Sequence, residues 1–108
     1  MKQFKVNVTI DRPIGYVDSY QNEYPINYGY IEGIIAQDNE WQDVYLLTDD
    51  IISAQVVSAN IIAIIVRDDD VEDKWVATTT QTTYSKEDIK KKTNFLEQYF
   101  NSSIILLD

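Results

Sequence analysis

Apolar and polar residues are arranged along the chain in short patterns that are typical of β-strands. Residues 4–10 alternate strictly between apolar and polar positions, and this period of two predicts a half-buried strand. Apolar runs rich in β-branched residues predict further strands over residues 31–36, 44–47, 51–66 and 75–80. Gly33 marks a bulge or kink in the first of these runs. Residues 58–60 leave open whether the longest run forms one strand or two.

A helical pattern replaces the strand pattern near the C-terminus. Ser85 followed by Asp88 resembles a capping box, in which a hydroxyl and a carboxylate bond reciprocally at a helix start. Apolar residues then recur near helical spacing, so we expect a helix over residues 86–100. The apolar tail at residues 104–107 must pack on something. Many short strands with one late helix predict a mainly β (α+β) fold for a single domain of residues 1–108, a small closed or nearly closed β-barrel against which the helix packs.

Two clusters of acidic residues stand at predicted strand ends. Five of the six residues from Asp68 to Asp73 are acidic, and Lys74 follows them. A second cluster covers residues 38–43. Carboxylates packed together repel one another unless a positive charge is present. A solvated turn is the simpler interpretation of one such cluster, whereas two clusters favour a divalent-metal site.

Composition narrows the chemistry that the chain can perform. The 108 residues include 9 basic and 18 acidic ones, giving a net charge of −9, and neither His nor Cys occurs. The charge argues against nucleic acid or an anionic membrane as partner, and the missing residue types argue against zinc sites, thiolate chemistry and Ser-His-Asp catalysis. Oxygen-bound metals such as Mg²⁺ fit the remaining carboxylates. No signal peptide or membrane-spanning stretch is visible, so we expect a cytoplasmic protein.

Four segments resemble the family I soluble inorganic pyrophosphatases, in particular a short bacterial-type member. They are residues 24–30 (YPINYGY), 38–44 (DNEWQDV), the acidic run that ends in Lys74, and 95–99 (FLEQY). They occur in the family's order, and the resemblance extends over about residues 4–104. It implies an OB-like five-stranded β-barrel with flanking helices. It also implies Mg²⁺-dependent hydrolysis of pyrophosphate to two phosphates in a carboxylate-lined site at one end of the barrel, with Mn²⁺ as an alternative metal.

The resemblance assigns roles to the cluster at residues 38–43. Asp38 and Asp43 match the family's signature carboxylates and are the expected Mg²⁺ ligands. Glu40 matches the acid that assists the attacking water, which makes it the expected catalytic residue. Asn39 replaces the usual glycine, and asparagine visits left-handed backbone conformations more readily than most residues.

The register of the second acidic cluster is ambiguous. The family has an acid two residues before the lysine, which selects Glu72, and another five positions earlier, where this chain has Arg67. A shortened turn must therefore supply the second acid. We favour Asp70 and Glu72 as metal ligands, with Asp73 and Asp68 as the alternatives that a five-residue spacing allows.

Phosphate-binding positions follow in the same way. Tyr28 and Tyr99 match the family's two phosphate-contacting tyrosines, and Lys74 matches its lysine. Arg12 matches the phosphate arginine at a different spacing, and a surface arginine beside a proline turn is an equal alternative. Two departures stand out: only 23 residues precede the first motif, so the family's N-terminal hairpin is expected to be missing, and Phe100 stands where a lysine is usual.

Three functional hypotheses follow from these residues. The leading one is a Mg²⁺-dependent inorganic pyrophosphatase whose small-molecule partner is pyrophosphate. The second is a hydrolase of another phosphoanhydride. The third is a catalytically weak or silent binding module, whose interface would use Trp41 and residues 104–107. A homo-oligomer is compatible with each of them.

Overall fold

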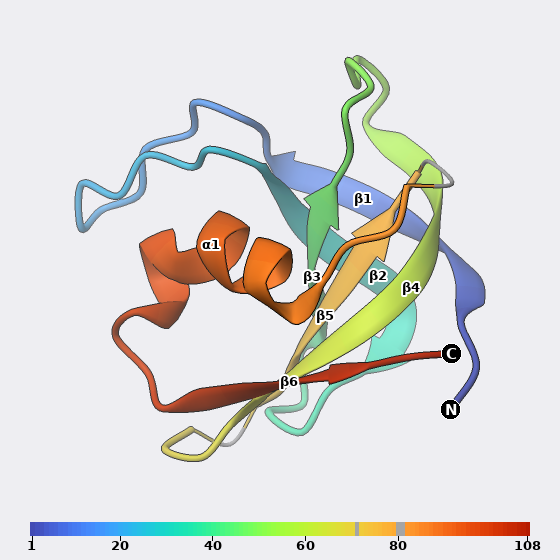
Figure 1. Cartoon of the computed structure of the whole chain (residues 1–108). Coiled ribbons are helices and arrows are strands. Elements are labelled where there is room, and N and C mark those ends of the chain that lie inside the picture. The colour runs from blue at the N-terminus through green and yellow to red at the C-terminus, as the bar shows by residue number, and fades with distance from the viewer. Residues whose placement is uncertain (71, 80–81) are drawn as a thin grey trace.

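Five strands of the chain close into a β-barrel against which one helix packs (Figure 1). The computed structural model describes residues 1–70, 72–79 and 82–108. Its elements are β1 (Phe4–Arg12), β2 (Asn27–Ile35), β3 (Trp41–Leu47), β4 (Val56–Arg67), β5 (Lys74–Thr78), α1 (Lys86–Glu97) and β6 (Ser102–Leu106). The barrel follows the order β1-β2-β3-β5-β4, and the pairing of β4 with β1 closes it. The first half of β4 pairs with β1, and its second half pairs with β6.

The architecture confirms the predicted five-stranded barrel with a C-terminal helix, but several element boundaries differ. The run at residues 51–66 forms one strand that begins at Val56, without a break at residues 58–60. The helix ends at Glu97. The apolar tail is part of a strand, since Ile104 pairs with Ile65 and Leu106 with Ala63. Val71 in the acidic run and residue 80 at the end of a predicted strand lie outside the described residues.

Two glycines of β2 allow the barrel to bend and close. A Cβ atom on Gly29 would lie 1.9 Å from the carbonyl oxygen of Thr9, so only glycine permits this approach of β1 to β2. Gly33 has a φ of 91°, and the register of β2 against β3 shifts between Ile31 and Ile35. The predicted bulge at Gly33 is therefore confirmed, and it bends β2 just before the acidic turn at residues 38–40.

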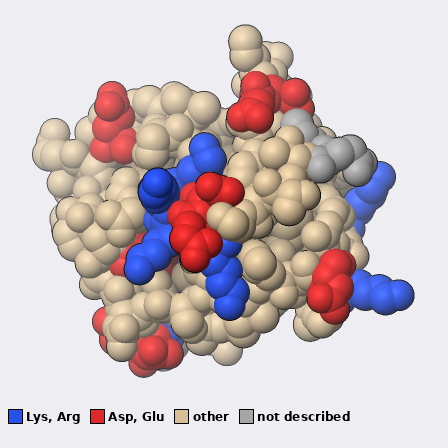
Figure 2. Space-filling view, in the orientation of Figure 1, with Lys and Arg blue, Asp and Glu red and all other residues tan. Residues whose placement is uncertain are grey.

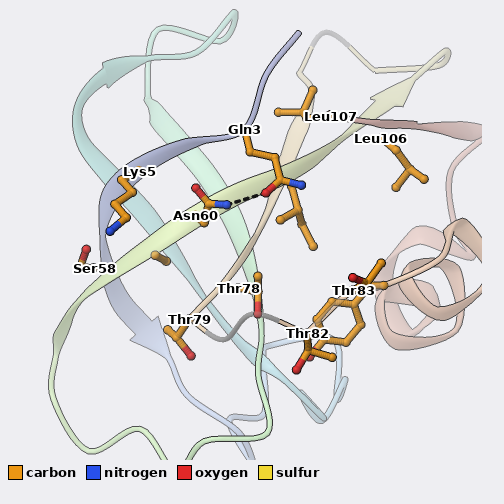
Figure 3. A pocket seen from close by; sticks show the side chains of 13 residues that line it. Gln3, Lys5, Ser58, Asn60, Thr78, Thr79, Thr82, Thr83, Leu106 and Leu107 are labelled. Carbon is orange, nitrogen blue, oxygen red and sulfur yellow. Dashed lines mark hydrogen bonds between the residues drawn. The ribbon is translucent and has the colours of Figure 1, made fainter.

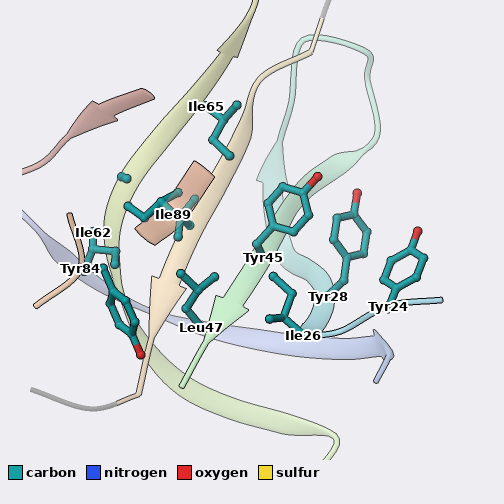
Figure 4. Packing of buried hydrophobic residues seen from close by; sticks show 11 residues of the cluster. Tyr24, Ile26, Tyr28, Tyr45, Leu47, Ile62, Ile65, Tyr84 and Ile89 are labelled. Atoms are coloured by element: carbon teal, nitrogen blue, oxygen red, sulfur yellow. The ribbon is translucent and has the colours of Figure 1, made fainter. Parts of the chain in front are cut away.

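Alternation along β3 separates two clusters of buried side chains. Tyr45 and Leu47 belong to the cluster that includes Ile89 of α1, whereas Val44 and Leu46 belong to the other. Since successive side chains point to opposite faces of a strand, residues 43, 45 and 47 share the face that α1 covers. Figure 4 shows Tyr45 and Leu47 of this face together with Ile89 of α1. The polar residues described below lie on this face.

Helix α1 begins at the predicted capping box. The side chain of Ser85 accepts a bond from the Asp88 backbone N–H, and the Asp88 carboxylate accepts one from the Ser85 N–H. The buried positions Ile89, Thr93 and Glu97 recur at intervals of four residues. Lysines and acids gather over the exposed side of α1 (Figure 2). No helix in the described part of the chain is long and apolar enough to cross a membrane.

Candidate active site

Three tyrosines stand side by side on the face of the barrel that α1 covers. Tyr24 precedes β2, Tyr28 lies in β2 and Tyr45 lies in β3, where it is the register partner of Tyr28. Their rings meet edge to face, with centroids 5.7 Å apart for Tyr24 and Tyr28 and 5.2 Å apart for Tyr28 and Tyr45. Figure 4 shows the three hydroxyl groups pointing in the same direction. The motif YPINYGY thus supplies two of the three hydroxyls in this row.

The hydroxyls of Tyr24 and Tyr28 each bond directly to a basic side chain, and that of Tyr45 is linked to one through Glu97. Arg12 Nη1 donates to the Tyr24 hydroxyl at 2.5 Å. Lys74 Nζ donates to the Tyr28 hydroxyl at 3.0 Å. The Tyr45 hydroxyl donates to Glu97 Oε2 at 2.6 Å, and the same oxygen accepts from Arg67.

The three basic residues line one open pocket. The pocket has a volume of about 640 Å³, and its lining also includes Tyr28, Glu72, Tyr99 and Phe100. Two arginines and a lysine around one cavity, together with tyrosine hydroxyls, favour an anionic ligand that has several oxygen atoms.

Lys74 contacts two carboxylates and one tyrosine hydroxyl. It opens β5, its side chain is only 5% exposed, and Nζ contacts Asp43 Oδ2 at 2.6 Å as well as Glu72 Oε1 and the Tyr28 hydroxyl. Burial lowers the pKa of Lys74, but the contacts with Tyr28 and Asp43 outweigh burial and leave the pKa above its ordinary value. Burial also raises the pKa of Tyr28, and the Asp43 charge adds to this effect. At neutral pH, therefore, Lys74 is charged and Tyr28 keeps its proton.

Arg67 ends β4 and is held from several sides. Its Nε and Nη2 donate to the two carboxylate oxygens of Glu97 at 3.1 and 2.6 Å, which is a bidentate pair. Nη1 lies 3.3 Å from Asp70 and 3.7 Å from Glu72. The guanidinium carbon stands 3.7 Å from the centre of the Phe100 ring. Because the Arg67 side chain is only 4% exposed, this is a buried charge with a fixed orientation.

The turn before β3 presents the first acidic cluster. Asp38 Oδ1 accepts the Glu40 backbone N–H at 3.0 Å, and Asn39 has a φ of 67°, as expected of an asparagine that replaces glycine. A hydrogen bond with Glu72 lowers the pKa of Asp38. Burial raises the pKa of Glu72, and the bond to Asp38 raises it further. The turn thus brings Asp38 against Glu72 of the second cluster.

The structure brings most of the predicted site residues together. Asp38, Asp43, Glu72, Lys74 and Tyr28 form one connected group, and Asp70 joins it through Arg67. Arg12 and Tyr99 line the same pocket, and the Tyr99 hydroxyl reaches Asn22 at 3.5 Å. Glu40 is exposed in the turn beside Asp38.

Two further predicted residues are placed by contacts of their backbones. The Asp73 carbonyl accepts from Gln42 Nε2 at 2.8 Å, and the Asp68 N–H donates to the Asn101 carbonyl at 2.8 Å. Trp41 is 41% exposed and stacks on Tyr30 beside Asp43.

Sequence reasoning missed Arg67, Glu97 and Tyr45 as members of this group. Ala63, Ile65 and Arg67 share one face of β4, so the strand period aims an arginine at the cluster. Ile89 and Glu97 are separated by eight residues, which places Glu97 on the buried face of α1. A charged residue at an otherwise buried position was the available signal in both elements.

A second pocket has a different chemical character. Its volume is about 500 Å³, and Figure 3 shows side-chain hydroxyls and amides around it. Asn60 Nδ2 donates to Gln3 Oε1 at 2.6 Å across one side. Lys5 is the charged residue among the described side chains that line it. The convergent cations and carboxylates belong to the Lys74 pocket, which is therefore the candidate active site.

Comparison with known proteins decides the family. A family model described as inorganic pyrophosphatase matches residues 5–105. The chain belongs to the inorganic pyrophosphatase family. This confirms the resemblance found in the sequence and identifies a hydrolase of the inorganic diphosphatase class. No curated protein matches the sequence.

Solved structures of bacterial inorganic pyrophosphatases share the fold. The enzyme from Ehrlichia chaffeensis matches with a TM-score of 0.71 at 18% identity, covering 95% of this chain and 86% of that one. The enzyme from Neisseria gonorrhoeae gives 0.64 at 20% identity, covering 88% and 73%. The enzyme from Coxiella burnetii gives 0.64 at 19% identity, covering 97% and 83%.

Inorganic pyrophosphatases imply a divalent metal cofactor, and the residues of this chain fit it only in part. Carboxylate oxygens are suitable ligands for Mg²⁺. Within residues 1–70, 72–79 and 82–108, however, no group of three or more acidic side chains could hold a metal ion. Asp43 and Glu72 contact Lys74 instead, and Asp70 contacts Arg67. As arranged, the carboxylates do not fit a metal cluster that the protein alone would hold.

Proposed function

We propose that this pyrophosphatase-family chain hydrolyses inorganic pyrophosphate to two phosphates in the Lys74 pocket. The observation that carries the proposal is the convergence of Arg12, Lys74 and Arg67 on one cavity, each linked to a tyrosine of the same row. Pyrophosphate is a compact anion with many oxygen acceptors, and such anions are bound by arginine, lysine and hydroxyl donors. Family membership supplies the independent support.

Lys74, Arg12, Tyr28 and Tyr99 are the proposed phosphate-binding residues. Tyr28, Asp43 and Glu72 already contact Lys74 Nζ. A phosphate oxygen would therefore replace one of these partners, and the neutral Tyr28 hydroxyl is the least costly to exchange. Arg12 and Tyr99 line the same pocket, where they can hold the second phosphoryl group. These contacts would orient the anhydride bond for in-line attack.

Glu40 is the proposed group that accepts a proton from the attacking water. It lies in the turn before β3, whose shape the bond from its N–H to Asp38 fixes. Its side chain is exposed, so solvent water can reach it. Glu40 lines the shallow pocket that includes Asp43, and a carboxylate that holds the attacking water there can act as a general base.

The metal is best treated as part of the substrate. We propose that pyrophosphate enters as its Mg²⁺ complex, or its Mn²⁺ complex, in which the cation neutralises phosphate oxygens and favours attack by water. Mg²⁺ in proteins usually keeps several waters and binds one or two carboxylates together with substrate phosphates. The predicted ligands Asp38, Asp43, Asp70, Glu72 and Asp73 are the candidates for that contact.

A second candidate function follows from the aromatic pair beside the site. Trp41 and Tyr30 stack with ring centroids 5.4 Å apart, and both line a shallow pocket that also includes Asp43. A phosphoanhydride that carries a planar base, such as a nucleoside diphosphate, would find a stacking surface there. This observation favours hydrolysis of another phosphoanhydride over a silent module.

Phosphate release from both substrates tests these proposals. Full-length chain is incubated with pyrophosphate or with a nucleoside diphosphate, each with Mg²⁺, with Mn²⁺ or with EDTA. We expect release from pyrophosphate with a metal and none with EDTA. If phosphate were released from the nucleotide and not from pyrophosphate, the nucleotide would be the substrate. If neither compound released phosphate at micromolar protein, the proposed hydrolysis would be wrong. Lys90→Met, which removes an exposed lysine of α1, is the control for nonspecific charge effects.

A further inference from the structure

Arg67 is a fixed positive charge among the carboxylates of the pocket. Its guanidinium contacts Glu97 through two donors and Asp70 through a third, and Glu72 lies 3.7 Å away. The Tyr45 hydroxyl also donates to Glu97, so this carboxylate is oriented by two side chains. The Phe100 ring covers the guanidinium. Arg67 therefore cannot turn toward bulk water without breaking a buried network.

The position of Arg67 affects which cations the carboxylates can accept. Glu72 contacts both Arg67 and Lys74, and Asp70 forms an ion pair with Arg67. A divalent ion bound by Asp70, Glu72 and Glu97 would have to displace the guanidinium. Displacement would leave a buried positive charge without its partners, a state that proteins strongly disfavour.

Carboxylates still outnumber the cations in this group. Asp38, Asp43, Asp70, Glu72 and Glu97 surround Arg67 and Lys74. Their negative charge offsets the attraction of the pocket's cations for a free polyanion, and a polyanion that carries positive charge of its own meets less repulsion. A metal complex of pyrophosphate is such a polyanion.

We propose that Arg67 is a resident counter-cation that takes the place of one protein-bound divalent metal ion. The substrate-free chain then holds no divalent ion tightly at Asp70, Glu72 and Glu97, and the metal needed for turnover arrives with pyrophosphate. Arg67 is a positioning residue in this scheme, because it holds Glu72 and Glu97 in place. The inference rests on the proposed function for its substrate, but its statement about the free chain is separately measurable.

Calorimetric titration of Mg²⁺ into the substrate-free chain tests the proposal. The wild-type chain should bind Mg²⁺ weakly. Arg67→Met should bind Mg²⁺ about tenfold more tightly or better, because Asp70, Glu72 and Glu97 lose a fixed counter-ion, and a tenfold change corresponds to about 1.4 kcal/mol of binding free energy. The double variant Arg67→Met/Glu97→Gln should also gain affinity, although its net charge equals that of the wild type. Lys90→Met carries the same charge change as Arg67→Met at an exposed site and should gain none.

The double variant also guards against misfolding. Glu97→Gln removes the carboxylate that Arg67→Met would leave buried and unpaired, and it keeps an oxygen that can accept the Tyr45 hydroxyl. Far-UV spectra and melting curves show which variants are folded. A positioning role in packing alone would change the melting temperature without changing Mg²⁺ affinity, and that result would overturn the proposal.

The outcomes separate this proposal from the proposed function. Tight, stoichiometric Mg²⁺ binding by the substrate-free wild type would overturn the role of Arg67, even if pyrophosphate were hydrolysed. Conversely, a gain of Mg²⁺ affinity in both Arg67 variants would support the counter-cation, even if the wild type released no phosphate. In that case the proposed substrate would be wrong and the account of the charges would stand.

Discussion

At the scale of single residues, Lys74 connects the two acidic clusters. Its Nζ contacts Asp43 from β3 and Glu72 from the segment before β5, and both contacts are close. The pKa of Lys74 lies above its ordinary value mainly because its contacts with Tyr28 and Asp43 outweigh burial. The lysine therefore stays charged throughout the pH range in which an enzyme assay is practical. Removal of the lysine should therefore weaken substrate binding or slow turnover, in addition to changing the ionisation of the neighbouring carboxylates.

Three substitutions should separate the proposed roles in the site. Asp43→Asn should raise the Mg²⁺ concentration needed for activity, because Asp43 is a proposed contact for the metal of the substrate.

Glu40→Gln should lower turnover by roughly a hundredfold, which is the low end of a general-base contribution. Its metal requirement should change little. Lys74→Ala should raise the Michaelis constant for pyrophosphate, lower turnover or do both. Steady-state kinetics at several Mg²⁺ concentrations measures each effect.

Controls for these three variants are available within the chain. Asp49→Asn removes an exposed acid of another turn and should leave the kinetics unchanged. Far-UV spectra should match the parent, because the three side chains are not part of either apolar cluster. If all three variants kept the parent's kinetics, the site would lie elsewhere even though the fold is that of the family.

At the scale of elements, the contact between β1 and β2 depends on one glycine. A Cβ on Gly29 would lie 1.9 Å from the Thr9 carbonyl oxygen, and both partners are backbone that cannot turn aside. Gly29→Ala should therefore destabilise the chain by roughly 3 kcal/mol or more, the upper part of the range for overpacking. Urea unfolding measures the change.

Gly33 provides a matched comparison for Gly29 on the same strand. It has a φ of 91°, but a Cβ there would meet nothing within 4 Å. Gly33→Ala should cost only the strain of a left-handed residue, about 1 kcal/mol. Equal losses for the two variants would contradict the close approach of β1 and β2.

The capping box of α1 gives the stability a defined pH dependence. Hydrogen bonds from the Ser85 backbone N–H and hydroxyl lower the pKa of Asp88 in the folded chain. A carboxyl whose folded pKa is depressed stabilises the fold above its unfolded pKa of about 3.9 and loses this contribution as the pH falls through the folded pKa. Asp88→Asn should thus be less stable than the parent at pH 6.

The stability difference between Asp88→Asn and the parent should shrink as the pH falls toward 3. Urea unfolding at several pH values measures it, and a difference that stayed constant would rule out the linkage.

Ser85→Ala should lower stability by about 1 kcal/mol at neutral pH, as is usual for loss of an N-cap. Glu97 is the last residue of α1, and Tyr99 follows two residues later. Loosening the first turn of α1 should therefore affect the pocket less than loosening its last turn.

At the scale of the whole molecule, the barrel was predictable from the sequence because its signals are local. Strict alternation in β1, the short apolar runs of β3 and β5, and the capping box each appear within a few residues. The strand β6 was not, because the short run at residues 104–107 becomes a strand only by pairing with β4. Its partner lies about forty residues earlier, and no pattern within the run itself reveals it.

The same distinction applies to the candidate site. The acids and Lys74 could be found because they cluster in the sequence, and the family resemblance then ordered them. Arg67 and Glu97 are 30 residues apart and Tyr45 is 52 residues from Glu97. Arg67 and Glu97 are each marked by a charge at a position that their own element buries, but only the fold brings these two residues and Tyr45 together. The internal cation that occupies the carboxylates could therefore not be recognised from the acidic run alone.

The net charge of −9 makes the response of the whole molecule to cations a sensitive test. Any salt should stabilise such a chain by screening repulsion between its acids. Mg²⁺ alone should raise the melting temperature no more than NaCl of equal ionic strength, because Arg67 and Lys74 already pair with the acids of the pocket. This expectation differs from that of an acidic cluster without internal cations, which Mg²⁺ would stabilise strongly.

Mg²⁺ together with imidodiphosphate, a slowly hydrolysed analogue of pyrophosphate, should instead stabilise the chain well beyond this salt effect. At about 100 times the dissociation constant, a ligand that binds only the native state adds about 2.7 kcal/mol. For a chain of this size each kcal/mol raises the melting temperature by about 4 °C or more, so the shift should reach roughly 10 °C. Lys74→Ala should lose most of it, whereas Lys90→Met should keep it. A large shift with Mg²⁺ alone would mean that the carboxylates bind metal in the free chain, and the internal cations would then have to move aside.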